Sequence, residues 1–201
     1  MEKGRLEAFS DGVIAILITI MVLELKVPHG ADWASLVPLL PIFLSYVLSF
    51  VFLGIYWSNH HHLLQAVEQV NGAVLWSNLH LLFWLSLIPF VTGWMGENGF
   101  GQLPVMLYGV VLWLAAIAYY LLTRTLISLH GRDSTLARAL RRKGKEYTSL
   151  VLYTAAIPLS LVSPAVSMGL YVLVTVIWLI PDPRIEKKVM EEKGDSVGPE
   201  G

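Results

Sequence analysis

The chain has 201 residues and a formal net charge of −1, with 55% hydrophobic and only 14% charged residues. That is too little charge to cover the surface of a soluble domain of this length, and the near-neutral balance gives no general attraction to nucleic acid. The chain has no cysteine, so disulfide frameworks and thiol chemistry are excluded.

The charges are unevenly distributed. Four stretches contain no Asp, Glu, Lys or Arg: residues 33–67, 69–96, 98–123 and 147–181. About 20 apolar residues cross a bilayer core, so each stretch is long enough to span a membrane. Together with the apolar segment near the front of the chain, they predict an all-α integral membrane protein.

The sequence predicts six transmembrane helices. We expect the first over about 5–26, ending before Pro28, the second from about 36 to beyond Trp57, the third over about 73–91 and the fourth over about 103–129. Residues 59–72, "NHHHLLQAVEQVNG", are expected to form the second connector. The 35 charge-free residues 147–181 are expected to hold two helices with a hinge at Ser163 and Pro164. Trp57 is expected to lie near a span end as an interfacial aromatic residue.

Basic residues predict the orientation. They gather in the connector after the fourth helix and in the tail: Arg132, Arg138, Arg141, Arg142, Lys143, Lys145, Arg184, Lys187, Lys188 and Lys193. The connectors expected on the opposite side carry no Lys or Arg. The positive-inside rule therefore predicts a multi-pass cell-membrane protein with both termini cytoplasmic. We expect one transmembrane domain over residues 1–181 and a charged cytoplasmic tail over residues 182–201.

The first helix, "RLEAFSDGVIAILITIMVLEL" (residues 5–25), carries an apolar stripe. On a wheel of 100° per residue, the positions within about 40° of Ile16 are Arg5, Phe9, Gly12, Ile20 and Leu23. Asp11 lies on the other side of the helix. A cap at the membrane surface is the simpler interpretation of Ser10 and Asp11, but residues 13–23 alone are too short to cross.

A carboxylate inside a span needs a partner. The candidates for Asp11 are Asn78 and His80 on the third helix, which begins at the same side, with Trp76 nearby as an indole donor. Each of these residues could instead be satisfied locally.

The motif Arg5-x-x-x-Phe9-Ser10-Asp11, followed by "GVIAILITIMVLEL", resembles the signature of the transmembrane-protein-175 family of potassium channels. The run "WSNLHLLFWLSLIPF" (residues 76–90) is also similar to that family. The resemblance implies a homotetramer in which four copies of the first helix line a central pore. It also implies that Ile16, Ile20 and Leu23 match the three apolar constriction positions. The implied permeant ion is K⁺, and no cofactor is expected.

The residues fit this interpretation. No "TVGYG"-like stretch is present, so a filter of backbone carbonyls is excluded. Ile16, Ile20 and Leu23 recur at i, i+4 and i+7, and a ring of such side chains can gate by dewetting. The alternative is a stripe that merely packs against other helices.

Two polar residues adjoin the stripe. Thr19 could offer a hydroxyl behind the constriction or bond a carbonyl of its own helix. Glu24 could ring the outer mouth and attract cations; the alternatives are a pair with Lys26 or a simple solvated helix end.

The histidine run is the other unusual feature. Three consecutive histidines point 100° apart on a helix and cannot all face one ion. His60 could approach His80, but hydrogen bonds to the first helix or a wet, pH-sensitive membrane edge are favoured over a metal site, so we expect no bound metal. No nucleophile–base set or phosphate loop is visible, so we expect no enzyme.

The sequence therefore predicts a potassium-selective, moderately selective cation channel. Its partners are expected to be the lipid bilayer, permeant monovalent cations and its own copies, with no nucleic acid. The residues expected to form a structural or gating network are Arg5, Phe9, Ser10, Asp11, Trp76, Asn78 and His80. The alternative is a proton- or metal-coupled transporter that uses Asp11 and histidines as an intramembrane relay.

Overall fold

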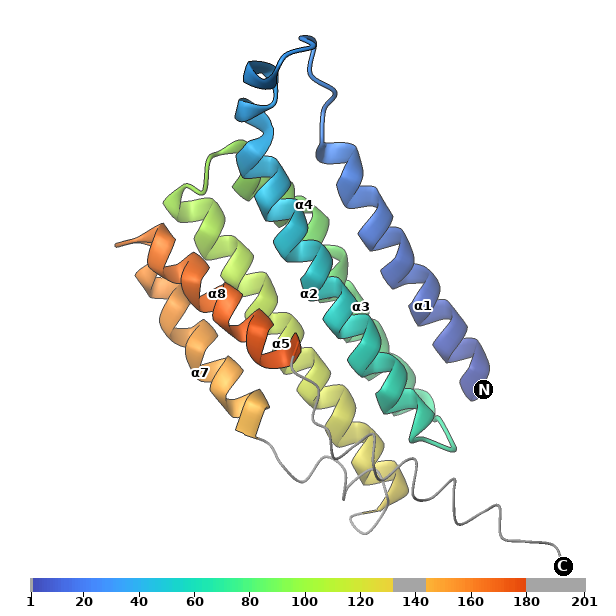
Figure 1. Ribbon diagram of the computed structural model, residues 1–201. Coiled ribbons are helices and arrows are strands. Elements are labelled where there is room, and N and C mark those ends of the chain that lie inside the picture. The colour runs from blue at the N-terminus through green and yellow to red at the C-terminus, as the bar shows by residue number, and fades with distance from the viewer. Residues whose placement is uncertain (1, 132–143, 180–201) are drawn as a thin grey trace, which may run out of the picture.

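The computed structural model describes residues 2–131 and 144–179, which form helices joined by short connections and contain no strand (Figure 1). The α-helices are α1 (Lys3–Ile20), α2 (Leu40–Gln65), α3 (Gly72–Ser86), α4 (Ile88–Glu97), α5 (Gln102–His130), α7 (Gly144–Leu159) and α8 (Pro164–Leu179). The described part of the chain also contains three short 3₁₀ helices, η1 (Met21–Glu24), η2 (Trp33–Ser35) and η3 (Val37–Leu39). The predicted all-α class is confirmed.

Within residues 2–131 and 144–179, four segments are long and apolar enough to cross a membrane: Lys3–Glu24, Trp33–Gln65, Gly72–Glu97 and Gln102–His130. Helices α7 and α8 occupy the positions predicted for the last two spans and meet at the predicted Ser163–Pro164 hinge. Each has 16 residues, which makes it about 24 Å long at 1.5 Å per residue. Most of the basic residues that predict the orientation, and the predicted tail, lie outside the described residues.

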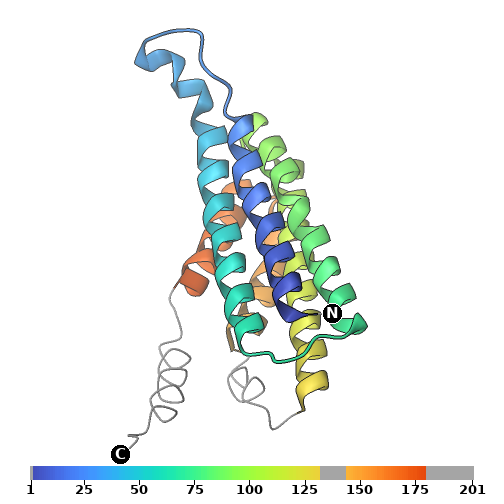
Figure 2. The ribbon, with the colours of Figure 1, turned by 90° about the vertical axis from the view of Figure 1, so that its right-hand side faces the viewer.

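Helix α1 lies on the outside of the bundle, where it packs against α2, α3 and α4. Figure 1 shows it at the edge of the molecule, and Figure 2 shows it in front, with α7 and α8 on the far side against α5. The N-terminus, the α2–α3 connection and the end of α5 share one end of the bundle. Successive membrane crossings are expected to bring the N-terminus and every second connection to the same end in this way.

The connection between α2 and α3 is shorter than the sequence suggests. Helix α2 continues through His60, His61 and His62 to Gln65, so the prediction that residues 59–72 form a connector is wrong. Leu63 and Leu64 are buried and keep this last turn against the core. Asn71 then caps α3 by accepting a hydrogen bond from the Val74 amide, 3.0 Å away.

The third predicted helix is divided in two. Helix α3 ends at Ser86, and α4 begins at Ile88 with Pro89 in its first turn. Proline has no amide hydrogen and clashes with the preceding turn, which accounts for the break. The two halves still form one apolar segment long enough to span a membrane.

Buried hydroxyls join the middle of the bundle. Ser49 on α2 lies 2.6 Å from the Thr92 hydroxyl on α4 and 3.0 Å from the Tyr108 hydroxyl on α5. The Tyr108 ring contacts the Tyr171 ring of α8 in a tilted arrangement, with ring centroids 5.8 Å apart. These contacts fix α2, α4, α5 and α8 as one body against which α1 packs.

Gly109→Ala is expected to destabilise this body. A Cβ at position 109 would overlap the buried Tyr171 hydroxyl, so α5 and α8 would have to move apart. We expect a loss of about 1–3 kcal/mol, measured as a lower thermal midpoint of the detergent-solubilised protein. Gly54→Ala is the matched control. It also replaces a helical glycine by alanine, but the added Cβ meets no atom within 4 Å. Equal midpoints for the two variants would contradict the prediction.

Candidate pore-lining face of helix α1 and its polar supports

Helix α1 has one buried and one exposed face. The buried side chains follow the spacing of a helix stripe: Leu6, Ser10, Ile14, Leu17 and, in η1, Met21. The predicted pore stripe is on the opposite face, where Ile16 is 61%, Ile20 45% and Leu23 74% exposed. Phe9, Arg5 and Gly12 of the same stripe are also exposed. An apolar face of this kind needs a cover of lipid or of further protein.

The helix tightens at its outer end. Residues Met21–Glu24 form a 3₁₀ turn, in which side chains three apart are aligned along the axis. Leu23 therefore lies directly beyond Ile20, and the stripe stays on one face despite the change of period. The Thr19 hydroxyl donates to the carbonyls of Ala15 and Ile16, at 3.1 and 3.0 Å. Of the two alternatives for Thr19, this is the bond to a carbonyl of its own helix.

The charges at this end do not form the Glu24–Lys26 pair that was one of the alternatives for Glu24. Lys26 donates to Glu97 at the end of α4, 2.9 Å away, rather than to Glu24. This hydrogen bond and the charge of Glu97 raise the pKa of Lys26. Glu24 is exposed, with its carboxylate beside Gly93 of α4.

A buried hydrogen-bond chain anchors the other end of α1. The Asn78 amide donates to the Ser10 hydroxyl at 2.9 Å, and Ser10 donates to the Leu6 carbonyl at 2.8 Å. The His60 Nε2 atom lies 2.7 Å from the Asn78 side-chain oxygen, so it carries the proton and donates. Ser10, Asn78 and His60 are all fully buried. This chain, here called the Ser10–Asn78–His60 network, ties α1, α2 and α3 together.

Asp11 has a different partner from those expected. Its Oδ1 accepts a hydrogen bond from the Trp57 indole on α2 at 3.0 Å. The prediction that Asn78 or His80 pairs with Asp11 inside the chain is therefore wrong. His80 accepts from Trp84 one turn along α3, at 2.9 Å, and Trp76 is 75% exposed.

Sequence reasoning placed Ser10 and Asn78 in the network and favoured hydrogen bonds from the histidine run to the first helix, but it named neither His60 as the partner of Asn78 nor Trp57 as the partner of Asp11. The available signal was Ser10 itself, a polar residue in the otherwise apolar Leu6–Met21 stripe. Such a position demands a polar partner from a neighbouring helix.

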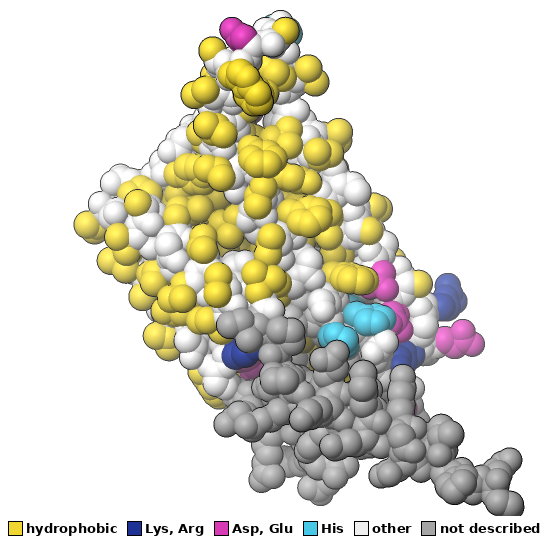
Figure 3. Space-filling view, viewed as in Figure 1, with side chains coloured by type: hydrophobic (Ala, Val, Ile, Leu, Met, Phe, Trp, Pro, Cys, Tyr) yellow, Lys and Arg dark blue, Asp and Glu magenta, His cyan; other side chains and the backbone are white. Residues whose placement is uncertain are grey.

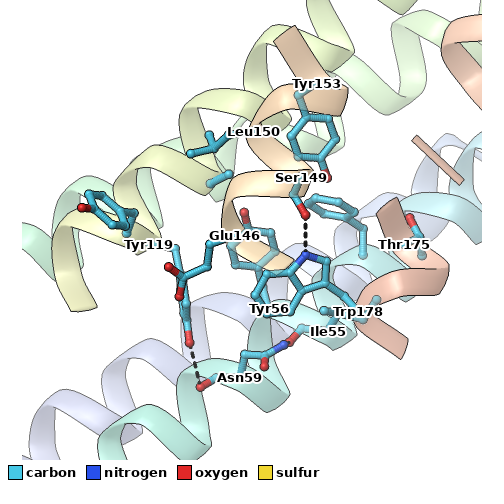
Figure 4. A pocket seen from close by; sticks show the side chains of 13 residues that line it. Ile55, Tyr56, Asn59, Tyr119, Glu146, Ser149, Leu150, Tyr153, Thr175 and Trp178 are labelled. Atoms are coloured by element: carbon cyan, nitrogen blue, oxygen red, sulfur yellow. Dashed lines mark hydrogen bonds between the residues drawn. The ribbon is translucent and has the colours of Figure 1, made fainter. Parts of the chain in front are cut away.

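A separate cavity of about 50 Å³ lies among α2, α5, α7 and α8 (Figure 4). Its walls are mostly aromatic and aliphatic, with the Glu146 carboxylate among them. The Tyr119 hydroxyl donates to the Asn59 carbonyl at 3.2 Å, and the Trp178 indole to Ser149 at 2.8 Å. Helix α1 contributes no lining residue, so the cavity is distinct from the candidate pore face.

The molecular surface agrees with a membrane protein. Figure 3 shows hydrophobic side chains over the middle of the bundle, with charged and histidine side chains gathered toward the end that holds the N-terminus.

Comparison with known proteins identifies the family. Residues 5–89 match the family model described as "Endosomal/lysosomal potassium channel TMEM175". Over 95% of its length the chain is 57% identical to "Potassium channel HX13_20290" of Chryseobacterium sp. (strain P1-3), all of which is covered. The chain belongs to the TMEM175 family.

Two further TMEM175 relatives extend the comparison. The crystal structure of "a lysosomal potassium-selective channel TMEM175 homolog" from Chamaesiphon minutus superposes with a TM-score of 0.74 at 28% identity, covering 88% of this chain and 96% of that one. The "Endosomal/lysosomal proton channel TMEM175" of Gallus gallus is 29% identical over 86% of this chain and 36% of its own length. The resemblance inferred from Arg5 to Asp11 is thus confirmed at the level of the family.

Proposed function

We propose that this chain is the subunit of a potassium channel, and that four copies surround a pore lined by the exposed face of α1. Membership of the TMEM175 family and the names of its bacterial relatives support potassium as the ion. The chain is then an ion channel and not an enzyme, and K⁺ is its permeant ion with no cofactor needed.

The exposed apolar stripe of α1 is the observation that carries this proposal. Ile16, Ile20 and Leu23 face away from their own subunit, while the Ser10–Asn78–His60 network holds the opposite face. A helix whose rotation is fixed in this way can present one defined face to a symmetry axis. Four-fold symmetry supplies the cover that a single chain lacks.

Rings of these side chains would form the constriction. Branched aliphatic side chains exclude water, so an ion crosses such a ring largely without its hydration shell. K⁺ sheds water more cheaply than Na⁺, which gives a moderate preference for K⁺. Thr19 and Glu24 adjoin the constriction, and Arg5 and Phe9 continue the same face toward the N-terminus.

The proposed location is the cell membrane, with both termini cytoplasmic. Six crossings place both ends on one side, and α7 and α8 serve as the fifth and sixth spans. By the positive-inside rule, the basic residues of the α5–α7 connector and of the tail indicate that this side is cytoplasmic.

The oligomeric state and the ion flux test the proposal together. Multi-angle light scattering in detergent is expected to give four chains per particle, because one copy of α1 cannot enclose a pore. Proteoliposomes with a K⁺ gradient are expected to pass current without any coupled ion. A monomer, or transport that requires a second ion, would contradict the proposal.

The animal relatives are named proton channels, which favours H⁺ as a second candidate ion. The same proteoliposomes separate the two ions. Under a pH gradient with equal K⁺ on both sides, a potassium channel reverses near 0 mV, whereas a proton pathway reverses at the proton equilibrium potential.

A further inference from the structure

Three metal-ligating side chains converge near the N-terminal end of α1. Glu7 and Asp11 are one turn apart on α1, so their carboxylates share one face. His61 reaches them from α2, and its Nδ1 lies 3.2 Å from the Glu7 Oε1. One ligand atom from each residue lies within 4.8 Å of the other two. Carboxylate oxygens and imidazole nitrogen are common ligands of Zn²⁺ and related transition metals.

Within the described part of the chain, the only cationic partner that these carboxylates have is His61, which forms an ion pair with Glu7 only when it is protonated. Neither Glu7 nor Asp11 forms an ion pair with Lys or Arg among residues 2–131 and 144–179. Lys3, at the same end, instead donates to the Gln65 carbonyl at 3.3 Å. The His61 Nδ1 atom is shielded from solvent and has no hydrogen-bond partner there. A bound cation would satisfy both the carboxylates and this nitrogen.

Outer contacts hold two of the three side chains in place. The Trp57 indole donates to Asp11 Oδ1, which leaves Oδ2 for an ion, and its ring stacks on His61 with centroids 6.0 Å apart. The Gln65 amide lies 2.8 Å from His61 Nε2. A half-turn of the Gln65 amide presents its oxygen to a proton on His61 Nε2, and Nδ1 is then free to bind an ion. Metal-ligating histidines commonly have such a partner.

We propose that Glu7, Asp11 and His61 form a binding site for a divalent transition-metal ion, with Zn²⁺ as the test ion. Bonds of about 2.1 Å require ligand atoms no more than about 4.2 Å apart, so side-chain movements of less than about 1 Å close the site. The bound ion ties α1 to α2.

A regulatory consequence rests on the proposed function. Asp11 lies five residues before Ile16 on the same helix, so an ion that holds α1 against α2 resists movements of α1 that widen the constriction. Zn²⁺ is therefore expected to reduce channel opening.

Isothermal titration calorimetry tests the site on the full-length protein in detergent, purified without a histidine tag. We expect one Zn²⁺ per subunit and a dissociation constant raised at least about tenfold by Glu7→Gln and by His61→Gln. His62→Gln is the matched control, since His62 belongs to the same run but is exposed and outside the cluster. It is expected to bind as the wild type does.

Several outcomes would overturn the site. They are a wild type with no saturable binding at millimolar Zn²⁺, variants that bind as the wild type does, and a His62→Gln protein that loses binding as fully as His61→Gln. Size-exclusion elution checks that each variant is folded. Asp11→Asn, which keeps an acceptor for Trp57, is a second carboxylate variant if Glu7→Gln fails this check.

Potassium flux in proteoliposomes tests the regulation. Zn²⁺ that saturates the calorimetric site is expected to reduce wild-type flux and to leave His61→Gln flux unchanged. Wild-type flux insensitive to saturating Zn²⁺ would overturn the regulatory role. Absence of flux without Zn²⁺ would count against the proposed function, whereas the calorimetric result would still support the site.

Discussion

Ile16→Asn is expected to increase current and to weaken the discrimination of K⁺ over Na⁺. Ile16 is 61% exposed on the α1 face that the proposed tetramer turns to its axis. Four asparagine amides would wet the constriction and replace part of the hydration shell of either ion. A barrier lower by about 1.4 kcal/mol corresponds to about tenfold more current. Under bi-ionic K⁺/Na⁺ conditions, the reversal potential is expected to move toward 0 mV.

Val151→Asn is the matched control for this prediction. Val151 is also an exposed branched side chain, but it lies on α7, across the bundle from α1. Ile14 is unsuitable as a control because it is fully buried, so an amide there would disturb the fold. If Ile16→Asn conducts with an unchanged reversal potential, or Val151→Asn shifts it equally, Ile16 does not line the constriction.

The sequence predicted the helical architecture because two strong signals agree in it. Long charge-free runs mark the spans, and the Ser163–Pro164 hinge divides the last run where α7 gives way to α8. Helical period also separated the two faces of α1, since Ile14 is buried and Ile16 exposed. Both signals depend on local sequence alone.

The partners across helices could not be predicted in this way. Whether Asp11 meets Trp57 or His80 depends on how α1 is rotated and where it crosses α2 and α3. Those parameters come from packing over the whole bundle. The sequence supplies the need for a partner but not its identity.

The end of α2 was missed for a related reason. A polar run containing Asn59 and three histidines is typical of a connector. Leu63 and Leu64 are buried, however, and their packing stabilises one more stretch of helix through Gln65. Once the run is helical, His60 turns into the bundle while His61 faces Glu7. The candidate metal cluster exists only because of this extra turn.

Asn78→Ala is expected to loosen α1 from its own subunit. The substitution removes the acceptor of His60 Nε2–H, which then has no partner in a fully buried position, and the donor to Ser10. An unsatisfied buried group costs about 1–3 kcal/mol, so a loss on the order of 2 kcal/mol is expected. It is measured as a lower thermal midpoint of the detergent-solubilised protein, accompanied by fewer tetramers because the pore face of α1 is no longer fixed.

Asn98→Ala is the matched control, because it makes the same substitution at a position outside the Ser10–Asn78–His60 network. Asn98 is exposed at the end of α4 and donates only within its own turn, to the Trp94 carbonyl, among the described contacts. It is therefore expected to cost less than about 0.5 kcal/mol. A double-mutant cycle with Ser10→Ala isolates the contact between α1 and α3, since the second substitution adds little once Asn78 is gone. Additive losses in that cycle, or equal midpoints for Asn78→Ala and Asn98→Ala, would mean that apolar packing rather than the Ser10–Asn78–His60 network sets the rotation of α1.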